Sequence, residues 1–236
     1  MQMRLPGLLE EGAGRLRIYS GYSFSIPREI QNLSCGIVSG PRWAANSCKQ
    51  FPLLPVILDN GAFPAWVRGE TLDFDDQLKS VKDAAKTIES HGLLEYVIAP
   101  DIVGGGSDSW SRTIKSIPHL SRYNLLLPVQ EGIDIEEAVS TCQKHGYGIF
   151  IGGKTMTFKV KTAEQINGRC YTHAGRVSRD GWLWTFSRLV DAVDSTTWVR
   201  SHNWNRTVDW ASILARYAKI ERAEIKKVDQ NGQKED

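Results

Sequence analysis

Three aspartates in this sequence each lie at the polar end of a short apolar run. Asp59 stands in LDNGAF, Asp101 in APDIVGG and Asp194 in VDAVDSTTW. A carboxylate can attack an electron-poor carbon, and a second carboxylate can give or take the proton that such a reaction moves. Paired carboxylates of this kind cleave glycosidic bonds through an oxocarbenium-like transition state. The sequence therefore supplies nucleophilic and acid–base groups, provided that the fold brings them together.

Polar or small residues end the other apolar runs. Gln130 follows YNLLLPV, Gly152 and Gly153 follow YGIFI, and His173 and Arg176 lie in THAGRVS. An amide both donates and accepts hydrogen bonds, glycine lets a ligand approach the backbone, and arginine contacts phosphate. None of the four cysteines belongs to a CxxC pair, and no His, Cys and acid cluster has metal-ligand spacing. We therefore expect no metal and no cofactor.

Each of these residues also has a simpler interpretation. Asp59-Asn60-Gly61 is a good tight-turn sequence, and Asp194 before a Ser-Thr-Thr run could cap a helix. Gln130 could tie one loop to another, and His173 could be a buried structural histidine. These alternatives stay open until the fold is known.

The candidate residues are spaced as the strand ends of a repeating strand–helix unit. Helical patterns such as FDDQLKSVKDAAKTIESHG, with its glycine stop, fall between the apolar runs. The repeat predicts a single-domain (β/α)8 TIM-like barrel without a zinc subdomain, with a doubly wound sheet as the alternative. The remaining strand is sought in CGIVSG. In such a barrel the active residues gather at the C-terminal ends of the strands. The predicted strand runs are RLRIYSGYS, CGIVSG, LPVILDNGAF, LEYVIAPDIVGGG, YNLLLPVQEG, YGIFIGGK, RCYTHAGRV and VDAVDSTTW.

Length and composition fit one globular domain. The chain has 236 residues, of which 41% are hydrophobic and 24% charged, and its formal net charge of +2 neither demands nor excludes nucleic acid. We assign residues 1–228 to the barrel domain and residues 229–236 to a polar, frayed tail. No apolar run approaches the ~20 residues of a membrane span, and the N-terminal pattern is not a secretory signal. We therefore expect a cytoplasmic protein without a membrane partner.

Taken in order, the strand ends resemble those of the tRNA-guanine transglycosylase superfamily, over roughly residues 55 to 200. Asp59 falls in a DSGGF-like segment, Asp101 matches the aspartate that reads the purine, and PVQEG with Gln130 matches a VQGG-like segment. IFIGGK matches a GG-containing strand end. VDAVDSTTWVR places Asp194 where the family's FDCVMPTR-like segment carries the nucleophile.

The details of the resemblance favour the DNA-modifying branch of this superfamily. The chain shows no CxCxxC-plus-His zinc module after the barrel, and it carries a THAGRVS-like segment. Small zinc-free forms of this kind are similar to the branch written DpdA, found in phages and bacterial genomic islands. The resemblance implies exchange of guanine in DNA for a 7-deazaguanine, such as 7-cyano-7-deazaguanine.

The resemblance also implies roles for individual residues. Asp194 would attack C1′ and form a glycosyl-enzyme, and Asp59 would serve as general acid and base. Asp101 and Gln130 would bind the base edge, and the backbone of the two glycines after IFI would approach O6. Phe63, or alternatively Trp66, would stack on a base flipped out of the helix.

The last third of the chain interleaves basic and aromatic residues. Trp198, Arg200 and Arg206 have the character that suits a nucleic-acid backbone and unstacked bases. The expected partners are DNA, with tRNA as the alternative, and the free 7-deazaguanine base; an ATP-driven partner that opens the duplex is left open. The competing functions are a tRNA-guanine transglycosylase, a base-releasing N-glycosidase and a non-catalytic nucleic-acid-binding barrel.

Overall fold

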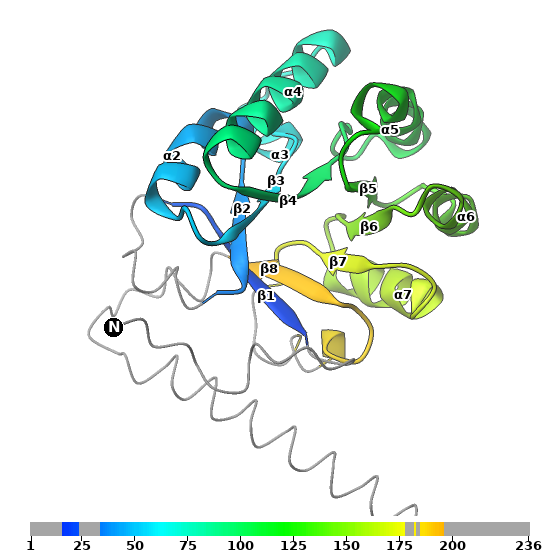
Figure 1. Ribbon diagram of the computed structural model, residues 1–236. Coiled ribbons are helices and arrows are strands. Elements are labelled where there is room, and N and C mark those ends of the chain that lie inside the picture. Colours follow the sequence, from blue (N-terminus) through cyan, green and yellow to red (C-terminus); the bar gives the residue numbers. More distant parts are fainter. Residues whose placement is uncertain (1–15, 24–33, 178–181, 183–184, 196–236) are drawn as a thin grey trace, which may run out of the picture. The chain divides into compact units, whose positions relative to one another are not determined.

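Eight parallel strands close into a barrel (Figure 1). A computed structural model of the chain describes residues 16–23, 34–177, 182 and 185–195. The strands pair in chain order, and the eighth returns to pair with the first. This confirms the predicted (β/α)8 fold. It excludes the doubly wound sheet, because an open sheet leaves two unpaired edges and this one has none.

Each predicted apolar run contributes one strand, including CGIVSG, which forms the second. The bounds are β1 (Arg17–Gly21), β2 (Gly36–Ser39), β3 (Pro55–Leu58), β4 (Leu93–Ile98), β5 (Leu125–Val129), β6 (Gly148–Ile151), β7 (Thr172–Ala174) and β8 (Ala192–Ser195).

Helices surround the strands on the outer side (Figure 1). Asp73 and Asp134 cap the helices that follow them by accepting from backbone N–H groups of the first turn. The helix before β7 begins at Met156, because the Thr155 hydroxyl accepts from Phe158 N and caps it there. The bounds are η1 (Pro41–Trp43), α2 (Ala44–Gln50), α3 (Ala62–Val67), α4 (Phe74–His91), α5 (Gly106–Leu120), α6 (Ile135–His145) and α7 (Met156–Ile166).

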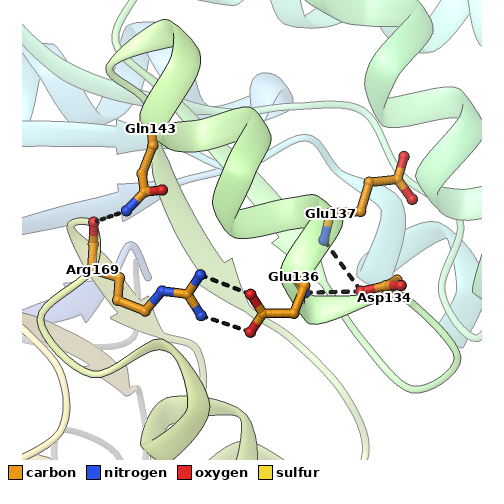
Figure 2. A network of polar contacts seen from close by, with 5 residues as sticks. All are labelled: Asp134, Glu136, Glu137, Gln143 and Arg169. Atoms are coloured by element: carbon orange, nitrogen blue, oxygen red, sulfur yellow. Dashed lines mark hydrogen bonds and ion pairs between the residues drawn. The ribbon is translucent and has the colours of Figure 1, made fainter.

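Helix α6 is tied to the segment that enters β7 (Figure 2). Arg169 reaches Glu136 with two nitrogens, at 2.6 and 2.8 Å, and the Gln143 amide donates to the Arg169 carbonyl. Asp134 accepts from the N–H groups of Glu136 and Glu137 at the start of the same helix. Exposed ion pairs add little stability, so this network chiefly aligns α6 with the neighbouring strand connection.

The barrel interior changes from apolar to polar along the strands. Side chains two positions apart on a strand share a face. Asp59 and Asp194 come two residues after Ile57 and Ala192, and His173 lies within β7. The acids therefore stand above the apolar layer, at the C-terminal mouth where barrel enzymes place their chemistry. The layer below them consists of Tyr19, Ile57, Ile98, Leu126 and Ala192.

The chain divides into two compact units, and all the described residues lie in the first. The units are Met1–Val199 and Arg200–Asp236, and the barrel lies in the first. Trp198, Arg200, Arg206 and the tail at 229–236 lie outside the described residues, so their roles and the boundary at residue 228 stay predictions. Within the described part of the chain, none of the helices is long and apolar enough to cross a membrane.

A substitution of Gly36 can test how tightly the barrel interior is packed. A Cβ at this position would lie 2.6 Å from the Tyr19 ring and 2.6 Å from the Pro55 carbonyl oxygen. Gly36→Ala should therefore lower the free energy of unfolding by about 1–3 kcal/mol, since the backbone or the ring must move. Gly40→Ala is the matched control, because a Cβ there meets nothing within 4 Å and its φ is −72°. Urea denaturation measures both; equal stability of the two variants would contradict this account.

Candidate active site

Asp194 is a buried strand residue whose carboxylate is held from two sides. Its side chain accepts from His173 Nε2 at 3.0 Å through Oδ2 and from Arg176 N at 3.1 Å through Oδ1. The residue is only 8% exposed and lies within β8, so the helix-cap interpretation of the sequence does not hold. The two donors on different oxygens fix the orientation of the carboxylate.

His173 supports Asp194 from within the barrel. Its ring is fully buried and lies between Tyr19 and Phe150, with centroid distances of 5.4 and 5.5 Å. Nδ1 has no hydrogen-bond partner among the described residues. We assign the proton of a neutral ring to Nε2, because this tautomer donates to Asp194 and leaves only an acceptor unpaired. His173 therefore contacts Asp194, and its predicted contact with a substrate stays a prediction.

Asp59 shares the mouth with Asp194. Burial, and after it the negative charge of Asp194, raise the pKa of Asp59 to about 6 against the opposing effect of the N–H groups of Asn60 and Gly61. The turn interpretation of this segment also holds, since Gly61 has φ +78° and Asn60 Oδ1 accepts from Ala62 N. A carboxyl group of this kind can hold or release a proton near neutral pH.

Asp101 stands beside Asp59 and is held by two amides. Asn60 Nδ2 donates to its Oδ1 at 2.9 Å, and Gln130 Nε2 donates to its Oδ2 at 3.0 Å. Burial is the main cause that raises the pKa of Asp101 to about 7; the charge of Asp59 contributes to the rise, and the hydrogen bond from Asn60 and the charge of Arg112 oppose it. Within the described ranges, no three His, Cys, Asp or Glu side chains are grouped as metal ligands.

Gln130 joins the end of β5 to the loop that follows β4. Besides Asp101 Oδ2, Ile102 O and Ser109 Oγ both lie 2.8 Å from the amide nitrogen, so its two hydrogens are shared among three acceptors, and the amide oxygen accepts from Gly104 N at 2.6 Å. The residue is 4% exposed. The loop-tying interpretation of the sequence is therefore the one that the geometry shows, and the side chain acts on the site by orienting Asp101.

The two glycines after β6 differ in what their surroundings require. Gly153 has φ +82°, and a Cβ on it would lie 2.5 Å from the Phe158 ring. A Cβ on Gly152 would meet only Val129 O, at 3.5 Å. Position 153 therefore needs glycine for conformation and packing, and the predicted contact of this backbone with a base stays a prediction.

Aromatic and cationic side chains stand next to one another beside the acids. The guanidinium carbon of Arg176 lies 3.9 Å from the Phe63 ring centroid, and Phe63 lies 5.7 Å from Trp66. Lys154 Nζ is 5.8 Å from the Trp66 ring, and Trp66 is 49% exposed. The predicted stacking on Phe63 would have to displace or share the exposed Arg176 guanidinium.

Two residues of the site were not singled out from the sequence. The sequence indicates Asn60 only as part of a turn, although its amide also donates to Asp101. Lys159 is 3% exposed, and its Nζ donates to the carbonyl of Gly175. A signal for Lys159 exists, because its spacing matches the buried face of α7, which contains Thr162, Ala163 and Ile166. This spacing can be recognised in the sequence only if the helix is taken to begin at Met156.

Comparison with known proteins bears on the fold alone. The chain matches no protein-family model and no curated protein. Among solved structures it is similar to QR15, an aldolase, with a TM-score of 0.54 and 14% sequence identity over 79% of this chain and 93% of that chain. At this identity the likeness supports the barrel architecture and transfers no chemistry.

Asp59→Asn should stabilise the protein in a pH-dependent way. The folded-state pKa of about 6 lies above the ordinary 3.8, so ionising Asp59 at higher pH costs folding free energy. We expect a gain of roughly 1–2 kcal/mol at pH 8, which shrinks toward zero as the pH falls from the folded-state pKa toward the ordinary one, because the wild-type carboxyl group then becomes neutral. Urea denaturation at pH 8 and near pH 4 measures it. The same shift at both pH values would contradict the assignment.

Proposed function

We propose that this chain is a nucleic-acid base transglycosylase, a pentosyltransferase that exchanges guanine in DNA for a 7-deazaguanine such as 7-cyano-7-deazaguanine. One observation carries the proposal. Asp59 lies close enough to Asp194 for the charge of one to raise the pKa of the other, at the mouth of a single barrel. Two carboxylates around one sugar carbon are the groups that retaining glycosyl transfer uses.

The proposed reaction has two displacements at C1′. Asp194 attacks C1′ while the bond to guanine breaks, and the bonding electrons leave with the base, which takes a proton from Asp59. The incoming 7-deazaguanine then gives a proton to Asp59 and attacks C1′, and Asp194 departs as a carboxylate. A pKa of about 6 for Asp59 suits a group that must first donate and then accept.

Recognition of the base falls to Asp101 and the groups around it. An ionised Asp101 can accept from the ring N–H and the exocyclic amine of guanine, and its two amide partners, Asn60 and Gln130, fix its plane. The exposed Trp66 and the partly buried Phe63 offer aromatic faces for an unstacked base. The ordered resemblance to the transglycosylase superfamily is what favours a guanine-type base over other purines.

DNA is the proposed polymer on the evidence of the THAGRVS-like segment and the nearby positive charge. Arg176 in this segment is exposed, and Lys154 lies beside Trp66. Both can contact phosphate. Trp198, Arg200 and Arg206 complete the proposed nucleic-acid contacts from the sequence.

Incorporation of labelled base tests the proposal directly. The full chain is incubated with duplex DNA and labelled 7-cyano-7-deazaguanine, with and without a cell extract that supplies an ATP-driven partner. Asp194→Ala should form no covalent adduct with DNA, and Asp59→Ala should slow turnover by about 100- to 10,000-fold. Asp83→Ala, an exposed aspartate on α4, is the matched control and should keep the wild-type rate.

The assay separates the competing functions. Label in tRNA but not in DNA would change the polymer, and abasic sites without label would identify an N-glycosidase. Binding without any chemistry would identify a non-catalytic barrel. Wild-type rates in both active-site variants would refute the assigned roles.

A further inference from the structure

Lys159 is a lysine whose side chain is almost fully enclosed by the protein. It lies on α7, is 3% exposed, and donates from Nζ to the carbonyl oxygen of Gly175. Lysine is almost never fully buried unless a partner compensates the loss of water. The contacts of this lysine therefore call for a functional explanation.

The carbonyl that Lys159 binds belongs to the same peptide group as the N–H that binds Asp194. Gly175 contributes the C=O of this peptide, and Arg176 contributes the N–H, which donates to Asp194 Oδ1 at 3.1 Å. In a trans peptide the two groups point in opposite directions. The Gly175–Arg176 peptide thus has the lysine on one side and the carboxylate on the other.

This peptide is fixed in place by its surroundings. Gly175 N donates to Ile151 O at 3.0 Å, and a Cβ on Gly175 would lie 2.4 Å from the Phe150 ring. Arg176 has φ +58°, in the left-handed region that few non-glycine residues adopt. The hydrogen bonds at both ends of the peptide compensate for this conformation, and a positive charge at the oxygen polarises the N–H toward the acceptor.

We infer that Lys159 is a positioning residue for the proposed nucleophile: through the Gly175–Arg176 peptide it holds the Asp194 carboxylate in line with C1′. The inference rests on the proposed function. Lys159 does not touch the nucleic acid in this arrangement, because its ammonium group is buried against the peptide. It acts on the rate of attack rather than on binding of the polymer.

The protonation of Lys159 gives this role a pH signature. Burial lowers the pKa of Lys159 to about 8; the charges of Asp194 on β8 and Glu131 after β5 oppose the fall, and Arg176 adds to it. Lys159 is charged below this pH and loses its proton above it. The polarisation of the peptide should therefore weaken as the pH rises through about 8.

Substitutions on the buried face and on the exposed face of α7 test the inference. Lys159→Met should lower kcat by about 100-fold, with KM for DNA almost unchanged, since misplacing a reacting group has effects of this size. Lys159→Arg keeps the charge, so it should restore part of the rate and hold it above pH 8, where wild type declines. Lys161→Met on the exposed side of the same helix is the control and should match wild type.

A second measurement does not depend on activity. In the isotope-labelled full chain, the Arg176 amide resonance should titrate near pH 8 in wild type and should lose this step in Lys159→Met. If wild type transfers no base to any polymer, the proposed function fails, and the Arg176 resonance still decides whether the lysine acts on the peptide. The inference is overturned if that resonance titrates alike in both proteins, or if Lys159→Met only lowers stability and keeps the kcat and pH profile of Lys161→Met.

Discussion

Three carboxyl groups lie near one another at the barrel mouth, and their mutual repulsion determines which hydrogen-bond donors must surround them. A buried charge is tolerated only when hydrogen bonds replace the lost water. Asp194 receives donors from His173 and the Arg176 backbone, and Asp101 receives them from Asn60 and Gln130. Asp59, which lies near both acids, is left with backbone donors, so its pKa responds to the charge of Asp194. In the proposed reaction, the different roles of the acids follow from these unequal hydrogen-bonding environments.

The barrel makes such a cluster geometrically simple. Its strands run in parallel and in chain order, so that residues far apart in the sequence end at one rim. The likeness to the aldolase QR15, at 14% sequence identity, concerns this architecture alone. The barrel thus indicates where a reaction would take place. The hydrogen-bond donors around each acid indicate which kind of reaction the site could support.

Much of the fold could be predicted from the sequence because apolar runs and polar ends repeat with the period of a strand–helix unit. Strand β2 and the mouth position of the acids followed from this pattern. The hydrogen bonds of His173 and Gln130 to the two aspartates did not follow from it. The sequence shows that a residue ends a strand, but it does not show which groups that residue binds. Lys159 was missed because a lysine near a helix start is usually solvated, and the true start depends on the Thr155 cap.

Phe150 links the barrel interior to the alignment of the site. Its ring lies against His173 and occupies the space that a side chain on residue 175 would need. One aromatic ring therefore bears on both groups that donate to Asp194. A substitution of Phe150 should therefore change the orientation of the Asp194 carboxylate as well as the stability of the barrel.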